Sequence, residues 1–227
     1  MPRTARASRA GICYHVMNRG NARATVFFDE EDYLRFLDLL RRAKERLPTR
    51  VLAYCLMPNH FHLVIRPFQD GDLGVWMQWL LTSHVRWHQR RHRTTGRIWQ
   101  GRFKAFPIQS DVHLLTVMRY VERNPLRAGL VDKAAAWPWS SLDTRGRDLE
   151  GGLLSASPVP IEGRWEEWVE EPLSGAELER VRESARLERP FGDPAWVRGT
   201  AERLGLLRNL RPRGRPKGTG NESIWRS

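Results

Sequence analysis

Cysteine is scarce in this sequence, and long apolar runs are missing. The 227 residues include 2 cysteines, Cys13 and Cys55, too few for a disulfide framework, so a reducing, intracellular setting is expected. No apolar run approaches the ~18 residues that span a bilayer. No continuous apolar segment follows the arginines near the N-terminus, so a secretory signal is not indicated. We therefore expect a cytoplasmic protein with no membrane partner.

Lysine is also rare, although cations are not. Of 38 cationic side chains only Lys44, Lys104, Lys133 and Lys217 are lysines, and the rest are arginines. Arginine's planar fork suits bidentate phosphate contacts and stacking on bases. A net charge of +12 on a chain that is 41% hydrophobic, and so able to bury a core, favours a nucleic-acid partner. A solvated basic surface without a partner is the alternative.

The charge is unevenly distributed. Residues 1–140 hold 23 basic and 11 acidic side chains, residues 141–193 hold 7 and 13, and residues 194–227 hold 8 and 2. With the Gly/Ser/Pro breaks after Trp139, this pattern predicts three parts. They are a globular domain over 1–142, an acidic linker or helical segment over 143–193, and a basic C-terminal helix with a flexible Arg/Pro/Gly tail over 194–227.

Hydrophobic periodicity predicts alternating strands and helices in the first part. The expected strands are 12–17, 51–57, 60–66 and 101–108, and the expected helices are 30–47, 73–92 and 112–123. The order βαββαβ is that of the ferredoxin-like α+β fold, an antiparallel sheet with helices on one face. The opposite face is expected to stay open for a ligand.

His60 and His62 flank Phe61 at the start of a predicted strand. Residues i and i+2 of a strand point to the same face, so the two imidazoles can converge on one metal ion. Two solvated histidines are the alternative. A structural zinc site that also uses Cys13 or Cys55 is a further one, but the C-x-x-C spacing typical of such sites is missing.

Tyr120 and Asn124 lie one turn apart on the predicted helix over 112–123 and at its end. The apolar stripe of this helix consists of Val112, Leu115, Met118 and Val121. Tyr120 lies beside that stripe, where a tyrosine is by default an ordinary core-edge residue. If this helix packs near the His pair, however, the phenol oxygen can attack a phosphodiester, and a divalent ion held by the histidines can neutralise the phosphate oxygens.

Three strings together resemble a known family. They are YHVMNRGN (14–21), YCLMPNHFHLVI (54–65) and RYVERNPLRAGLV (119–131), the last followed by WPWSS. They resemble REP-associated tyrosine transposases, a branch of the single-tyrosine HUH transposases, over about residues 10–142. The resemblance implies an HUH nuclease fold, His60 and His62 as metal ligands, Tyr120 as nucleophile, and Asn124 as a third ligand or metal-shell group. It also implies Mg²⁺ or Mn²⁺, and a 5′-phosphotyrosine intermediate formed on single-stranded or hairpin DNA.

Candidate DNA contacts come from several parts of the sequence. Asn18, Arg19 and Arg23 follow the first strand and are candidates for reading a single-stranded guide sequence. Candidates for phosphate contacts are Arg90, Arg91, Arg93, Arg102 and Lys104. In the tail, Arg213 and Arg215 belong to a Pro-Arg-Gly-Arg-Pro-Lys sequence that is typical of an AT-hook; a non-specific basic tail is the alternative.

The resemblance implies an enzyme of DNA transposition that is cytoplasmic and associated with the nucleoid. A non-catalytic DNA-hairpin-binding protein or regulator with the same fold is the competing function. A replication initiator or conjugative relaxase is a third, disfavoured by the short chain and the single candidate tyrosine. The resemblance leaves the choice between monomer and homodimer open.

Overall fold

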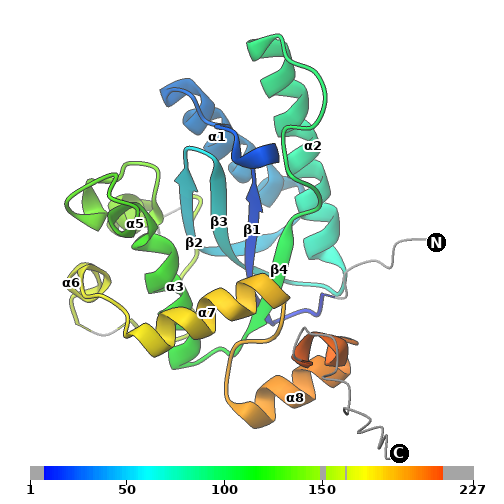
Figure 1. The fold of residues 1–227 in the computed structure, drawn as a ribbon, viewed down its shortest axis with the longest axis vertical. Helices are drawn as coiled ribbons and strands as arrows, with labels where there is room; N and C mark the ends of the chain where they lie inside the picture. The colour runs from blue at the N-terminus through cyan, green and yellow to red at the C-terminus, as the bar shows by residue number, and fades with distance from the viewer. Residues whose placement is uncertain (1–7, 149–151, 162, 212–227) are drawn as a thin grey trace, which may run out of the picture.

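A four-stranded antiparallel sheet forms the centre of the molecule (Figure 1). The computed structural model describes residues 8–148, 152–161 and 163–211. The strands are β1 (Cys13–Arg19), β2 (Thr49–Met57), β3 (His60–Pro67) and β4 (Lys104–Ile108). They are arranged in the order β2-β3-β1-β4. Helix α1 (Glu30–Arg46) connects β1 to β2 and α2 (Asp72–His92) connects β3 to β4, which confirms the predicted ferredoxin-like α+β class.

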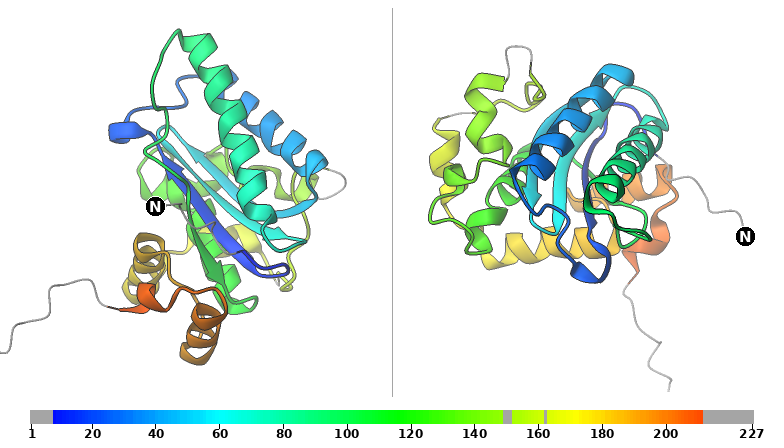
Figure 2. Two further views of the ribbon diagram at one scale, coloured as in Figure 1. Left: turned by 90° about the vertical axis from the view of Figure 1, so that its right-hand side faces the viewer. Right: turned by 90° about the horizontal axis from the view of Figure 1, so that it is seen from above.

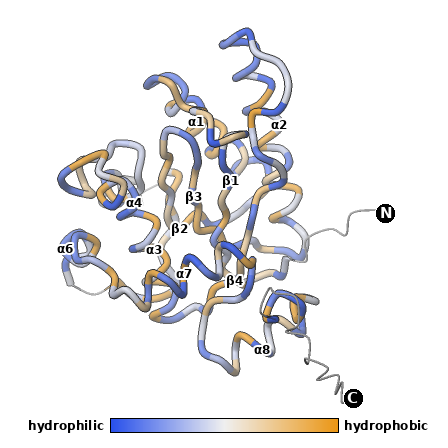
Figure 3. The backbone as a smooth tube through the Cα atoms, in the orientation of Figure 1, coloured by the Kyte–Doolittle hydropathy of each residue, from blue (hydrophilic) through white to orange (hydrophobic). Residues whose placement is uncertain are grey.

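Helices α1 and α2 lie side by side on one face of the sheet (Figure 2). Asp29 is the N-cap of α1, and its side chain accepts a hydrogen bond from the backbone N–H of Asp32, which satisfies a donor that the first turn leaves unpaired. Alternate residues of β3, namely Phe61, Leu63 and Ile65, face these helices and are fully buried. Hydrophobic residues follow the strands, while the far end of α2 is hydrophilic (Figure 3).

The opposite face of the sheet, predicted to stay open, carries a second helical layer. Helix α3 (Val112–Glu122) packs against β2, β3 and β4, and the short α4 (Asn124–Arg127) follows it. Val112, assigned to the apolar stripe of this helix, is instead 58% exposed. At 3.6 residues per turn it lies on the opposite side of the helix from Leu114, Val117 and Val121, which are fully buried. Leu115, Met118 and Val121 belong to the second core as predicted.

The residues after 142 complete this second layer. The helices in this part are α5 (Ser141–Asp148), α6 (Trp165–Glu170), α7 (Gly175–Leu187), α8 (Pro194–Arg203) and η3 (Leu207–Leu210). Two short 3₁₀ helices lie earlier in the chain, η1 (Asn21–Arg23) and η2 (Ala134–Ala136). Val169 of α6 and Val181 of α7 are fully buried in the core that contains α3. Helix α7 crosses in front of β4 (Figure 1). The segment predicted as an acidic linker or helical segment thus contributes helices to this core.

None of the helices in the described ranges is both long enough and apolar enough to cross a membrane.

Candidate active site

The His pair lies at the start of β3, on the sheet face that α3 covers. Phe61 points to the opposite face, as the alternation of a strand requires. The ring centroids of His60 and His62 are 5.0 Å apart. His62 is 2% exposed, whereas His60 is partly exposed. The structure therefore brings the two predicted ligands together on one face.

Asn59 determines which nitrogen of His60 carries the proton. The Asn59 amide nitrogen donates to the carbonyl oxygen of Arg23 at 3.1 Å, so the Asn59 Oδ1 faces His60. That oxygen is 2.6 Å from His60 Nδ1 and can only accept, so Nδ1–H donates to it. The Nε2 of His60 then carries a lone pair, which is the state of a metal-ligating imidazole.

His15, in the middle of β1, is the polar neighbour of His62. Its Nε2 lies 2.9 Å from His62 Nδ1, and the two rings are parallel with centroids 5.0 Å apart. His15 is fully buried. His15 was not predicted as a site residue, although β-strand alternation places it on the face opposite to Tyr14 and Val16, which is the face of His60 and His62.

Tyr120 approaches the histidines from α3. Its ring centroid lies 5.8 Å from that of His62 and 6.1 Å from that of His15. The residue is 6% exposed, and together with His60 it lines a pocket of about 410 Å³. Tyr120 and His60 therefore share one cavity, and the His62 ring lies next to Tyr120.

Asn124 and Arg127 form the next turn beyond Tyr120. The Asn124 amide nitrogen donates to the backbone oxygens of Tyr120 and Val121, at 2.9 and 3.4 Å. Its side-chain oxygen accepts a hydrogen bond from Arg127, whose guanidinium lies over the Tyr120 ring. In this arrangement Asn124 links the end of α3 to Arg127. Arg127 was not predicted as a site residue, although it lies within the string RYVERNPLRAGLV that carries the family resemblance.

Electrostatics keep the His pair neutral. Burial, aided by the charges of Arg19 and Arg127, lowers the pKa of His60 to about 4. Burial and the neighbouring histidines lower the pKa of His62 well below its ordinary value. A neutral imidazole has a lone pair to give, so both side chains are in the ligand state at neutral pH.

The donor set fits a divalent ion. Within the described ranges, no hydrogen bond occupies Nε2 of His60 or of His62, while the Nδ1 atoms of both rings are engaged. Such engagement of the second nitrogen is characteristic of metal-binding histidines. Cys13 and Cys55 are buried free thiols, and neither belongs to a metal-ligand cluster in the described part of the chain. The cysteine-containing zinc alternative therefore gains no support.

The pocket beside Tyr120 is basic. Four predicted DNA-contact residues line it: Asn18, Arg19, Arg102 and Lys104. Asn18 is 7% exposed, and its amide nitrogen donates to the Gly101 carbonyl at 3.1 Å. Two more arginines, Arg182 and Arg186 of α7, line the same pocket. These two arginines were not predicted as DNA contacts, because acidic side chains outnumber basic ones in their segment.

The other predicted DNA contacts lie further away. Arg90 and Arg93 are exposed at the end of α2, and Arg23 is exposed in η1. Arg91 instead forms ion pairs with Asp29, Glu31 and Asp32 at 2.9, 2.8 and 2.6 Å, which engage its guanidinium with α1. Arg213 and Arg215 lie outside the described residues.

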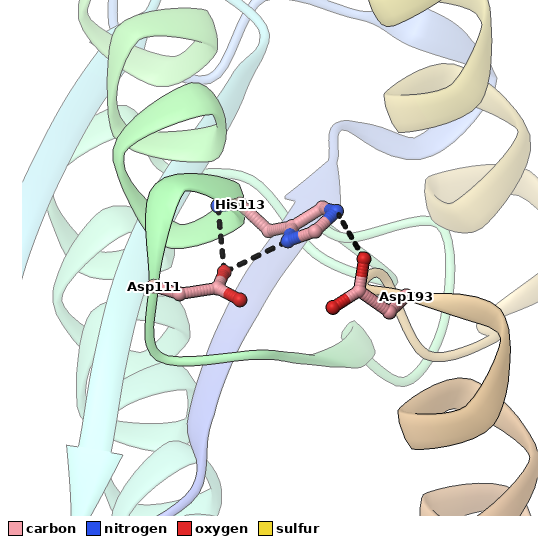
Figure 4. Close-up of side chains that lie close together, drawn as sticks. All are labelled: Asp111, His113 and Asp193. Carbon is pink, nitrogen blue, oxygen red and sulfur yellow. Dashed lines mark hydrogen bonds and ion pairs between the residues drawn. The ribbon is translucent and has the colours of Figure 1, made fainter.

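Asp111, His113 and Asp193 form the one cluster of three potential metal ligands found among the described His, Cys, Asp and Glu residues (Figure 4). His113 Nδ1 is 2.8 Å from Asp111, and its Nε2 is 3.9 Å from Asp193. The two carboxylates thus approach opposite nitrogens of one ring. Asp111 also caps α3, and Asp193 precedes α8. This arrangement connects the starts of two helices and lies outside the Tyr120 pocket.

Comparisons with known proteins agree with this geometry. A family model described as "Transposase IS200 like" matches residues 8–124. A protein of Haemophilus influenzae assigned as a REP-associated tyrosine transposase is 29% identical over 122 residues, 48% of this chain and 69% of its own. The Escherichia coli REP-associated tyrosine transposase is 24% identical over 151 residues, 64% of this chain and 82% of its own.

A solved structure shares the fold. It is described as a REP-associated tyrosine transposase bound to a REP hairpin, and it matches with a TM-score of 0.53 and 21% identity. The match covers 77% of this chain and 96% of that one. It therefore extends beyond residue 142, into the second helical layer.

Proposed function

Because this chain belongs to the IS200-like transposase family, we propose that it nicks and rejoins single-stranded DNA at palindromic hairpins through Tyr120. The observation that carries the proposal is the 5.8 Å separation of the Tyr120 and His62 rings. Relatives named REP-associated tyrosine transposases, and a structural neighbour bound to a REP hairpin, support a hairpin of the REP type as substrate.

The reaction we propose is a transesterification. The Tyr120 hydroxyl oxygen attacks the phosphorus of a phosphodiester, and the bond between phosphorus and the 3′-oxygen breaks. The phenol proton passes to solvent, and the departing 3′-oxygen takes a proton to become a free 3′-hydroxyl. The 5′-phosphate stays on Tyr120, so the bond energy is retained and a 3′-hydroxyl can reverse the step elsewhere without ATP.

His60 and His62 would hold Mg²⁺ or Mn²⁺ through their Nε2 atoms. When bound, the ion would neutralise the non-bridging oxygens of the scissile phosphate. Asn59 accepts the Nδ1 proton of His60, so the lone pair of the His60 ring is on Nε2. We also propose Asn124 as a third ligand. In the structure its amide nitrogen donates to the end of α3, and its amide oxygen accepts a hydrogen bond from Arg127.

DNA would enter along the basic pocket. Arg19, Arg102 and Lys104 lie at the rim beside Tyr120 and are exposed, so we assign them to the phosphates of the cleaved strand. Arg23, Arg90 and Arg93 lie outside this pocket and are candidates for the hairpin or guide. Salt-dependent binding is the expected signature.

A labelled hairpin with single-stranded flanks tests the proposal. Incubation with Mn²⁺ should give a covalent protein–DNA adduct that survives denaturation and is missing in Tyr120→Phe. Because Phe keeps the ring packing, the variant should bind the hairpin as the wild type does. If the wild type binds hairpins tightly but never forms an adduct, the non-catalytic hairpin-binding function is correct instead.

A further inference from the structure

His15 is a fully buried polar residue that the proposed reaction does not yet use. Its ring lies between Phe106, with centroids 4.9 Å apart at an interplanar angle of 66°, and Tyr120, at 6.1 Å and 90°. These aromatic contacts fix the ring, and they leave His62 as its hydrogen-bonding neighbour. His15 Nδ1 is buried without a hydrogen-bond partner in the described ranges. A polar residue enclosed in this way either only fills the core or positions His62.

The hydrogen bond between the two rings can run in either direction. If His15 Nε2–H donates, His62 Nδ1 is the acceptor, and a neutral His62 then carries its proton on Nε2 and cannot bind a metal there. If His62 Nδ1–H donates, its Nε2 has the lone pair that a ligand needs. His15 is fully buried, and its Nε2 lies 2.9 Å from His62 Nδ1, so its lone pair is placed to accept this proton.

We propose that His15 is a positioning residue that accepts the Nδ1 proton of His62 and so holds His62 in its metal-binding tautomer. It does for His62 what Asn59 does for His60, and both Nε2 atoms then present lone pairs from the same sheet face. The inference rests on the proposed function, because it assumes that His62 binds the ion. Mutation of a residue that hydrogen-bonds to a metal ligand typically lowers the metal affinity by about 10–100-fold.

The wild-type protein gives the first test. Long-range ¹H–¹⁵N spectra distinguish the two histidine tautomers, and the Tyr120→Phe variant in Mg²⁺ provides a diamagnetic sample that cannot react. We expect His62 with its proton on Nδ1 and His15 with its Nε2 unprotonated. A His62 proton on Nε2 in Mg²⁺ would overturn the proposal without any change at position 15.

Two substitutions at position 15 give the second test. His15→Gln keeps an acceptor near the place of Nε2, whereas His15→Phe keeps a ring but offers none. Mn²⁺ affinity is measured by electron paramagnetic resonance, with His60→Ala/His62→Ala as the control that lacks the proposed site. The affinity should fall about 10–100-fold in His15→Phe and stay near wild type in His15→Gln. Equal affinities in the two variants would contradict the positioning role.

The adduct assay separates this inference from the proposed function. If the wild type forms no adduct but the tautomer and Mn²⁺ results are as expected, the proposed reaction is wrong and the role of His15 stands. If the adduct forms normally and His15→Phe binds Mn²⁺ like wild type, only the role of His15 fails.

The pocket wall supplied by α7 carries a second, independent inference. Val181 and Ala185 anchor α7 in the core, which directs Arg182 and Arg186, one turn apart, into the pocket that contains His60 and Tyr120. Arg182 has no ion pair among the described residues, and Arg186 reaches Glu183 only at 4.0 Å. Both arginines are exposed. An otherwise acidic segment thus presents two available cations at the proposed active site.

We infer that Arg182 and Arg186 bind phosphates of the single strand as it passes Tyr120. Each phosphate contact contributes about 0.7 to the salt slope of single-strand binding. Arg182→Ala/Arg186→Ala should therefore lower the slope by about 1.4. The matched control is Arg42→Ala/Arg46→Ala, which removes two exposed charges from α1 on the other sheet face. Equal slopes in the two double variants would overturn the inference, whether or not the wild type forms an adduct.

Discussion

The guanidinium carbon of Arg127 lies 5.3 Å from the centroid of the Tyr120 ring. Arg127 is exposed, and its orientation is fixed by the hydrogen bond to Asn124. A cation in this place stabilises the tyrosine ring and, in the reaction we propose, negative charge on the phenol oxygen. The three residues Tyr120, Asn124 and Arg127 therefore act as one unit at the junction of α3 and α4.

Arg127→Met should slow adduct formation. An exposed cation–π contact contributes on the order of 1 kcal/mol, so a decrease of about fivefold in the single-turnover rate is expected. Arg127→Lys should recover part of the rate, because the ammonium keeps the charge but lacks the planar fork. A rate for Arg127→Met equal to wild type at saturating DNA would show that the contact is only packing.

Asn124→Ala should act through Arg127. In a double-mutant cycle, Asn124→Ala/Arg127→Met is expected to be no slower than Arg127→Met alone, since the amide orients a guanidinium that is no longer there. Mn²⁺ affinity decides between this role and direct ligation. If Asn124→Ala lowers that affinity while Arg127→Met leaves it unchanged, Asn124 is a ligand as the family resemblance implies.

The sequence predicted the elements of the site better than the contacts between them. Alternation along 60–65 was enough to place His60 and His62 on one face and Phe61 on the other, because strand geometry is local. The partnership of His15 with His62 depends on the pairing of β1 with β3, in which Met17 lies opposite His62. That register joins residues 47 positions apart and cannot be read from either strand alone.

The packing of the second helical layer could not be predicted for a similar reason. Segment 141–193 has more acidic than basic side chains, which indicated an acidic linker or helical segment. Trp165 and Val169 are nevertheless buried against α3, and the charges of α6 and α7 lie on their other faces. Composition averages over the faces of a helix, whereas the site depends on one face.

Glu122 should be the most sensitive charged residue of this layer. Its fully buried carboxylate accepts hydrogen bonds from Ser141, Arg145 and Trp165, so it joins α3 to α5 and α6. Glu122→Gln leaves the Arg145 charge uncompensated in a largely buried place, and the free energy of unfolding should fall by about 3 kcal/mol in urea titrations. Glu167→Gln, which breaks the exposed pair with Arg164, is the control and should change it by less than about 1 kcal/mol. Equal losses in the two variants would contradict a structural role for the buried pair.

Stability should fall in mild acid, in part because of His84. Its ring is fully buried among Phe27, Phe36 and Trp99, and both ring nitrogens lack a hydrogen-bond partner in the described part of the chain. Burial lowers the pKa of His84 to about 3, whereas an unfolded histidine titrates near 6.5. Between these values the unfolded state binds one more proton than the folded state, so this contribution to stability is present above pH 6.5 and is lost as the pH falls.

Replacement of His84 by leucine isolates this contribution. Each pH unit between the two pKa values corresponds to about 1.4 kcal/mol, so wild type should lose about 2 kcal/mol on this account between pH 7.5 and pH 5. His84→Leu should lack that part of the loss, because leucine cannot be protonated in the unfolded chain. His15 and His60, whose pKa values burial also lowers, titrate alike in both proteins and cancel in the comparison. Urea titrations at pH 7.5, 6 and 5 measure the difference, and parallel losses in the two proteins would show that His84 is not held neutral in the folded state.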